Sequence, residues 1–391
     1  MSGRRVFLYV QHLLGVGHLK RAAALAQALV ASGMEVTFAS GGFEVPGLAP
    51  AGARLVQLPP AGMPELDFRT LIDAEGNPVD DAWRRRRRDA LLAAWRSARP
   101  HTLVVELFPF GRRQMRFELL PLLEEAIASP HRPLIVSSVR DVLGGGQREP
   151  AKQDEMLALF ERYFDRVLVH GDPRFLAFDR TFRHAARLGE RLQYTGFIVD
   201  RSGSGGAGNG AGTDEVIVSV GGGAVGAHLL RTAIRARPLT TLAQHTWRIL
   251  TGVKTARHEF DELTRLAGDA GAGRVVIEHP RRDFPVLLQN SLLSISQAGY
   301  NTVMEILDCG ARAVAVPFAG GGEIEQTLRA RLLAAQGRIE IVEEDALTPG
   351  TLAEAVDRAA HRPRPGRGGV DLDGARKSAE WIAQWTEGLA W

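Results

Sequence analysis

Three segments in the second half of the chain combine glycines with groups that can bind an anion or a hydroxyl. They are Ser219-Val-Gly-Gly-Gly223, Ser296-Gln-Ala-Gly299 and residues 317–326, which read PFAGGGEIEQ. Each segment follows an apolar, β-rich run and leads into a helical pattern. The N–H groups at a helix N-terminus are unpaired and carry the positive end of the helix dipole, so they suit a phosphate. The alternative for each segment is a tight turn or a capped helix start.

Side chains within these segments suggest a larger ligand than phosphate alone. Glu305 lies about one and a half turns into the helix that follows Gly299, where a carboxylate can accept hydrogen bonds from two adjacent ribose hydroxyls. Glu325 and Gln326 lie near the next helix start and can bind sugar hydroxyls. The alternatives are a solvated helix face for Glu305 and acidic residues favoured by the helix dipole for the others. The glycine pattern matches neither a P-loop nor GxGxxG.

The first half of the chain offers groups for proton transfer. His18 follows Gly15-Val-Gly17 at the start of the first predicted helix, where an imidazole can take a proton from a hydroxyl. Glu106 ends a predicted strand and is a second candidate base. Arg140 and Asp141 follow another strand, where they can serve a ligand or form a structural ion pair.

Apolar runs that alternate with helical patterns predict where these segments lie. Strands are predicted at residues 6–10, 35–40, 54–58, 102–107, 133–139, 166–170, 215–220, 246–251, 274–278, 292–296, 312–317 and 339–342. Helices are predicted at residues 18–31, 80–98, 114–128, 152–164, 224–236, 259–267, 300–308, 324–335, 351–360 and 374–388. This alternation indicates parallel sheets covered on both faces, whose ligands bind beyond the carboxyl ends of the strands.

The length and one linker-like stretch predict two domains. At 391 residues the chain exceeds one ordinary core. Residues 202–212, SGSGGAGNGAG, read as a flexible connection. We predict a first domain at 1–198, a linker at 199–213 and a second domain at 214–370. The last helix, within 371–391, either packs back on the first domain or stays with the second.

Composition excludes several classes of protein. Hydrophobic residues make up 45% and charged residues 24%, as in ordinary globular proteins, and the net charge of +3 does not indicate a nucleic-acid binder. The single cysteine, Cys309, supports neither a disulfide framework nor a thiolate metal site. No run reaches the roughly 18 apolar residues of a membrane span, and the N-terminal run is broken by polar residues. A cytoplasmic protein is expected, with no metal.

The densest charge in the sequence is the run of arginines from Arg84 to Arg88, flanked by Trp83 and Trp95. A basic helix with aromatic neighbours can lie on an anionic membrane surface. Five consecutive arginines cannot share one helix face, so we favour a solvated helix. Contact of residues 83–95 with the inner face of the membrane is the alternative.

At this point the sequence resembles a known family. SVGGG, SQAGYNTVMEILDCGARAVAVPF and EQTLRARLL resemble the donor-binding segments of the MurG-like glycosyltransferases, glycosyltransferase family 28. The resemblance is best over residues 215–335 and looser over residues 4–199. It implies the GT-B fold: an α/β protein with two doubly wound, Rossmann-like domains and a cleft between them.

The resemblance also implies roles for individual residues. The diphosphate would face Gly222, Gly223, Ser296, Ala298 and Gly299. The same likeness assigns Glu305 to the ribose, Glu325 and Gln326 to the donor sugar, and Phe284 to the base. Gly17 and His18 match a turn in which the histidine faces the acceptor, although a second adjacent glycine is missing, and Arg329 stands where asparagine is common.

The implied activity is inverting, metal-independent transfer of a sugar from a nucleotide-sugar, such as a UDP-sugar, to a hydroxyl. His18 or Glu106 would deprotonate the acceptor, with Gly15, Gly17, Arg140 and Asp141 on the acceptor side. The UDP-sugar is a co-substrate, and no cofactor is implied. The acceptor is either soluble or lipid-linked. Two alternatives keep the same fold: a nucleotide-sugar 2-epimerase or hydrolase, and a non-catalytic nucleotide-sugar-binding protein.

Overall fold

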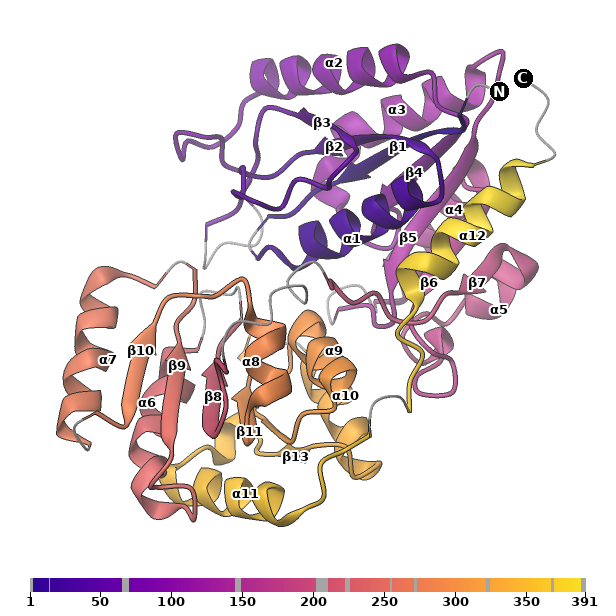
Figure 1. Ribbon diagram of the computed structural model, residues 1–391. Helices are drawn as coiled ribbons and strands as arrows, with labels where there is room; N and C mark the ends of the chain where they lie inside the picture. The colour runs from indigo at the N-terminus through magenta and orange to yellow at the C-terminus, as the bar shows by residue number, and fades with distance from the viewer. Residues whose placement is uncertain are drawn as a thin grey trace. The chain divides into compact units, whose positions relative to one another are not determined.

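The chain forms two compact units, Met1–Val199 with Val370–Trp391 and Asp200–Gly369 (Figure 1). We analysed a computed structural model. The structure describes residues 3–13, 15–64, 70–144, 149–201, 210–221, 226–253, 255–270, 273–320, 324–366 and 369–387. Most of the predicted linker, residues 202–209, and the predicted diphosphate-binding Gly222 and Gly223 lie outside these residues.

The first unit is built on a parallel sheet in the order β3-β2-β1-β4-β5-β6-β7. Its strands are β1 (Arg5–Val10), β2 (Glu35–Ser40), β3 (Arg54–Gln57), β4 (Thr102–Glu106), β5 (Leu134–Arg140), β6 (Arg166–His170) and β7 (Leu192–Tyr194). Six of these match predicted strands to within one or two residues. The edge strand β7 was not predicted, because three residues are too few to show a period of two.

Helices cover both faces of this sheet (Figure 1). They are α1 (Gly17–Ala31), α2 (Asp81–Ala98), α3 (Arg116–Ala128), α4 (Pro150–Tyr163), α5 (Ala185–Leu188) and α12 (Gly374–Thr386). Alternate residues of β1 separate the two cores. Phe7 and Tyr9 pack toward α2, α3 and α4, whereas Val6 and Leu8 pack toward α1 and α12.

The C-terminal segment completes the first unit. Ala379 and Ile382 of α12 are buried in the same core as α1. The amide of Phe197 donates to the carbonyl of Asp371, and the amide of Gly374 donates to the carbonyl of Phe197 at 2.9 Å. A Cβ at Gly374 would lie 2.3 Å from the carbonyl oxygen of Gly196, so only glycine allows this approach. Of the two placements expected for the last helix, the structure shows the one on the first unit.

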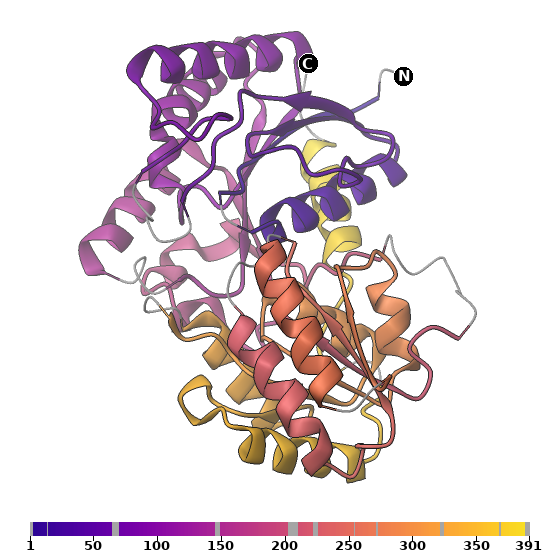
Figure 2. The same ribbon diagram turned by 90° about the vertical axis from the view of Figure 1, so that its left-hand side faces the viewer.

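The second unit repeats the design with a parallel sheet in the order β10-β9-β8-β11-β12-β13. Its strands are β8 (Glu215–Ser219), β9 (Thr246–Leu250), β10 (Val275–Glu278), β11 (Leu293–Ser296), β12 (Ala313–Ala315) and β13 (Glu340–Ile341). Its helices are α6 (Ala227–Ala236), α7 (Arg257–Asp269), α8 (Phe284–Asn290), α9 (Tyr300–Cys309), α10 (Glu325–Ala335) and α11 (Pro349–His361). In Figure 2, α6 and α7 lie side by side in front of the sheet. The α/β architecture of two doubly wound sheets is confirmed.

The arginine run on α2 is partly or fully exposed, as the favoured prediction of a solvated helix requires, with the exception of Arg87. Arg87 is fully buried, and its guanidinium forms hydrogen bonds with the Glu118 carboxylate at 2.6 and 2.9 Å. Trp83 and Trp95 are buried as well, so they pack in the protein and are not free to anchor a membrane. The prediction missed this because a buried arginine depends on a carboxylate from another helix, which a local charge pattern does not reveal.

No helix in the described part of the chain is long and apolar enough to cross a bilayer. The predicted cytoplasmic location, with or without contact with the inner face of the membrane, stays a prediction.

Candidate functional site

Each sheet has one point at which the order of its strands reverses, and the candidate residues gather there. In the first unit this switch lies between β1 and β4, and in the second between β8 and β11. Ligands of open parallel sheets bind beyond the carboxyl ends of the strands at such a switch. His18 follows β1 and Glu106 ends β4, while Ser219 ends β8 and Ser296 ends β11. We call the candidate residues of each unit a half-site.

His18 and Glu106 form a hydrogen-bonded pair in the first unit. The Nδ1 atom of His18 lies 2.7 Å from Oε1 of Glu106, whose side chain is 1% exposed, while that of His18 is 17% exposed. Arg21, one turn further along α1, also bonds Oε1 of Glu106. The two candidate bases therefore form one hydrogen-bonded pair. The sequence contained a signal for Arg21, because residues three apart on a helix share a face, but this residue was not predicted.

Burial and neighbouring charges set the protonation of this pair. Burial lowers the pKa of His18 to about 3. Burial acts to raise the pKa of Glu106, but the bond with His18 and the charge of Arg21 outweigh it and lower the pKa to about 2. At neutral pH Glu106 is therefore a carboxylate, which can only accept hydrogen bonds, so Nδ1 of His18 carries the proton. The Nε2 atom of His18 is then the basic nitrogen.

Two further arginines belong to this half-site. Arg140 is the last residue of β5, and Asp141 follows it in the buried interior. Arg112 follows β4 in the left-handed backbone conformation, with φ of 58°, and was not predicted as a site residue. Both Arg112 and Arg140 act to lower the pKa of His18. Gly15 lies between β1 and α1, as predicted, and Gly17 is the first residue of α1, one residue before the predicted start of this helix.

The stability of the protein should fall as the pH falls below 6.5, because two buried histidines resist protonation. Burial also lowers the pKa of His170 to about 3. Its ring nitrogens lie 2.7 Å from Oγ of Ser138 and 3.0 Å from Oγ1 of Thr195. Between pH 6.5 and about 4.5 the unfolded chain binds protons on His18 and His170 that the folded chain does not. The free energy of unfolding should therefore decrease by about 1.4 kcal/mol per pH unit for each histidine.

Urea unfolding at several pH values between 7 and 5 measures this slope. His170→Gln should remove the contribution of one histidine to the slope, whereas the same change at His258, an exposed histidine of α7, is the control. An unaltered slope in His170→Gln would contradict the assignment.

In the second unit, two hydroxyls meet at the switch point. Ser219 and Ser296 are register partners on β8 and β11. Their Oγ atoms are buried, and in the described part of the chain neither has a hydrogen-bond partner. A buried hydroxyl without a partner costs free energy, so both are groups that a ligand can pair with. Gly221 follows with φ of 64°, a backbone conformation that favours glycine.

Helix α9 begins beside these hydroxyls. Gly299 is its N-cap residue and Ala298 is fully buried, so backbone rather than side chains lies at the helix start. Glu305 is only 6% exposed, which rules out the solvated-face alternative for this residue. Asp308, three residues further along α9, forms an ion pair with Arg201 at 2.8 Å. Burial of a carboxylate inside a helix of the switch point is consistent with the ribose-binding role that the resemblance implies.

The start of α10 contains a buried ion pair. Glu325 accepts a hydrogen bond from Nη2 of Arg329 at 2.9 Å, and both side chains are buried. The guanidinium of Arg329 lies over the ring of Tyr300, 5.2 Å from its centroid. Gln326 accepts a hydrogen bond from the amide of Phe318 at 3.1 Å. Glu325 is therefore more than a dipole-favoured residue at a helix start.

Phe284 is placed differently from the other predicted donor-side residues. It begins α8, a helix that was not predicted, and packs against the small cluster formed by Ile217, Leu250 and Leu287. This packing gives Phe284 a structural role, and the predicted contact with the base stays a prediction. Among the described residues, no group of histidine, cysteine or acidic side chains has the arrangement of a metal site.

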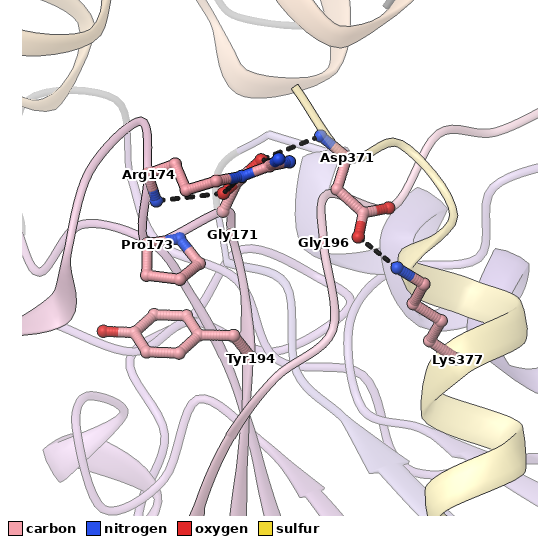
Figure 3. A pocket seen from close by; sticks show the side chains of 8 residues that line it. Gly171, Pro173, Arg174, Tyr194, Gly196, Asp371 and Lys377 are labelled. Atoms are coloured by element: carbon pink, nitrogen blue, oxygen red, sulfur yellow. Dashed lines mark hydrogen bonds and ion pairs between the residues drawn. The ribbon is translucent and has the colours of Figure 1, made fainter. Parts of the chain in front are cut away.

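A cavity of about 390 Å³ lies in the first unit, and none of the candidate residues is among those that line it (Figure 3). Its lining comes from the ends of β6 and β7 and from the C-terminal segment, and its charges are paired with one another. Arg174 bonds Asp172, whose carboxylate also accepts from the amide of Asp371, and Lys377 pairs with Asp371. We therefore interpret this cavity as part of the contact between the C-terminal segment and the rest of the first unit.

The two sheets and their switch points define the class of protein: the chain has the GT-B fold of glycosyltransferases. It is similar to the crystal structure of MurG from Acinetobacter baumannii, with a TM-score of 0.57 and 17% identity over 97% of this chain and 99% of the other. It is also similar to a UDP-glucosyltransferase from Polygonum tinctorium, with a TM-score of 0.60 and 14% identity over 99% and 94% of the two chains. At such low identity these likenesses show the fold alone.

Sequence comparison identifies the second unit. Residues 217–365 match the glycosyltransferase family 28 C-terminal domain, which confirms the MurG-like resemblance of this unit. The chain is 30% identical over 150 residues to UDP-N-acetylglucosamine–N-acetylmuramyl-(pentapeptide) pyrophosphoryl-undecaprenol N-acetylglucosamine transferase of Brucella canis. It is 31% identical over 147 residues to the protein of that name from an Exiguobacterium species. These matches cover 38% and 37% of this chain, and about two fifths of each relative.

Proposed function

We propose that this protein is an inverting, metal-independent glycosyltransferase that moves a sugar from a nucleotide-sugar to a hydroxyl acceptor. The observation that carries the proposal is the buried His18–Glu106 pair at the switch point of the first unit. A protein that only binds a nucleotide-sugar needs no base there. The family 28 domain in the second unit supports a nucleotide-sugar as donor, and the UDP-sugar named in the Brucella relative supports UDP as nucleotide.

His18 acts as the base in this proposal. Its Nδ1–H donates to Glu106, which fixes the tautomer and leaves Nε2 to take the proton of the acceptor hydroxyl. The acceptor oxygen then bonds the anomeric carbon while the bond from that carbon to the diphosphate breaks. The nucleoside diphosphate leaves, and the configuration of the sugar is inverted. The Glu106 carboxylate stabilises the imidazolium that forms, in the way an aspartate does in a catalytic triad.

The second unit holds the donor in this proposal. Backbone N–H groups at the start of α9 and the hydroxyls of Ser219 and Ser296 bind the diphosphate and stabilise its developing charge. Glu305 binds the ribose hydroxyls. Glu325, held by Arg329, and Gln326 contact the donor sugar.

The activity can be tested with the purified full chain in two steps. A thermal-shift panel of UDP-, GDP- and TDP-sugars identifies the nucleotide, because a ligand that binds only the folded state stabilises it. Incubation with the stabilising donor alone then separates the alternatives. Rapid release of nucleoside diphosphate or epimerised product without an acceptor would favour a hydrolase or 2-epimerase over a transferase. Failure of every nucleotide-sugar to stabilise the protein would refute the proposal.

Glu305→Ala should weaken binding of the stabilising donor by roughly 10- to 100-fold. The reason is the loss of hydrogen bonds from two ribose hydroxyls to a charged group. Calorimetric titration with the donor and with its nucleoside diphosphate measures the effect, which should be equal for both because the ribose is common to them. Glu354→Ala, which removes an exposed carboxylate on α11 of the same unit, is the matched control. Equal affinities of the Glu305 variant and the control would exclude this role.

A further inference from the structure

Arg21 is a buried cation of the first half-site to which the proposed reaction assigns no role. Its side chain is 3% exposed and belongs to α1, three residues after His18. Side chains at this spacing share a face of a helix. Both reach Glu106 at the end of β4, so the carboxylate beside the proposed base has a second contact from the same helix.

His18 and Arg21 share one oxygen of Glu106. The Nδ1 atom of His18 lies 2.7 Å from Oε1, and Nη2 of Arg21 donates to the same oxygen. The two nitrogens are 3.2 Å apart, and because a guanidinium only donates, Oε1 is the acceptor for both. The other oxygen, Oε2, is buried and has no hydrogen-bond partner in the described part of the chain. Among the described residues, Arg21 is therefore the one hydrogen-bond partner of the Glu106 side chain besides His18.

Charged and titratable groups from three strands surround this contact. They are Arg112 after β4, Arg140 at the end of β5 and His170 at the end of β6. Of the described cations, Arg21 is the one that bonds the Glu106 carboxylate directly. Burial acts to raise the pKa of Glu106, and the charges of His18 and Arg21 lower it. Without Arg21, this buried carboxylate would have a single donor and less compensating charge.

We infer that Arg21 is a positioning residue, which holds the Glu106 carboxylate ionised and in place so that His18 presents Nε2 to the acceptor hydroxyl. The inference rests on the proposed function, since it assigns a role in the same half-site. Arg21 acts through Glu106 and not on the substrate. Its charge also offsets that of the carboxylate. An adjacent anion without this compensation would favour the imidazolium, and a histidine that is already protonated cannot act as a base.

The protonation of His18 tests this role in the full chain without any substrate. The side chains of histidine are labelled with ¹⁵N, the ring nitrogens are observed by NMR from pH 8 to pH 5, and His18→Gln assigns the signals. The wild type should keep His18 neutral, with its proton on Nδ1. In Arg21→Met, His18 should take up a proton at a pH higher by roughly 2 units, so that protonated rings are present at pH 5. Arg21→Lys, which keeps the charge, should resemble the wild type.

Transfer kinetics then show whether Arg21 acts through Glu106. Arg21→Met should lower kcat roughly 10-fold and leave the donor affinity unchanged. In the Glu106→Gln background the same replacement should change kcat by less than about 2-fold, because no carboxylate is left to hold. Lys20→Met is the matched control, since residues two apart on a helix do not face each other. Equal losses of kcat in the two backgrounds would reduce Arg21 to a structural role and overturn the inference.

The two measurements separate the possible failures. If no sugar is transferred from any nucleotide-sugar, the proposed function fails, and the titration of His18 still tests Arg21. If His18 titrates alike in Arg21→Met and the wild type, the inference fails even where transfer is observed. Circular dichroism establishes that each variant is folded. Where Arg21→Met does not fold, Arg21→Gln, which keeps a donor without the charge, replaces it in both measurements.

Discussion

His18→Ala is expected to lower kcat about 10²- to 10⁴-fold, the usual contribution of a general base. The dissociation constant of the nucleotide-sugar should not change, because the donor residues belong to the second unit. Glu106→Gln should also lower kcat strongly. An amide cannot stabilise the imidazolium as a carboxylate does, and it no longer restricts Nδ1 to the role of donor.

The kinetics of the two variants should show that His18 and Glu106 act together in catalysis. The double variant should lose little more than His18→Ala alone, because residues that act together are strongly non-additive. The matched control is His184→Ala, which removes a surface histidine bonded to Asp154 at 2.6 Å. Transfer rates are measured at saturating donor, and donor affinity by titration. Full activity of His18→Ala would contradict the proposed mechanism. The conclusion that the chain has the GT-B fold would still hold.

Arg87→Ala is expected to destabilise the first unit by about 3–5 kcal/mol, the usual cost of breaking a buried ion pair. The substitution leaves the Glu118 carboxylate buried beside Tyr9, whose hydroxyl lies 2.5 Å from it. The guanidinium of Arg87 also donates to Gln11 at 2.5 Å and to the carbonyl of Gly41 at 2.7 Å. These groups come from four different segments, so one deletion leaves several buried polar atoms without partners.

Urea unfolding of Arg87→Ala beside Arg86→Ala measures this effect. Arg86 is the neighbouring arginine of the same run, but it is exposed, so its removal should change stability by at most about 0.5 kcal/mol. Joint replacement of Arg87 and Glu118 by methionine and leucine should recover much of the loss, because no charge is then left buried. Similar effects of the two single alanine variants would show that Arg87 does not hold the unit together.

The elements that the sequence predicted well are those with a strong local pattern. Strands β2 and β6 were predicted to the residue, because both are rich in apolar, β-forming residues and lie between clear breaks. Helix α8 was missed, since it has seven residues with proline at its second position. The three-residue strand β7 was missed for the same reason: a short element contains too few periods to show a pattern.

The candidate residues follow the same division. His18, Glu106, Ser296 and Glu305 could be proposed because each has a chemically informative side chain at the end of a predicted strand or in the helix that follows it. Their partners were not found when they come from elsewhere in the chain. Arg112 carries no local pattern at all, and Arg87 was hidden in a run whose other members are partly or fully exposed.

The sequence by itself determined the alternation of strands and helices, the two sheets and the likeness of the second unit to family 28. These properties depend on local periodicity and on contiguous motifs, both of which are present in consecutive residues of the sequence. Only the tertiary structure decided that His18 and Glu106, 88 residues apart, form a hydrogen bond, and that α12 belongs to the first unit. Only it placed Arg87 in the core, where Glu118 pairs with it. Such contacts join distant segments, and burial, which sets the energy of every charge among them, exists only once the chain has folded.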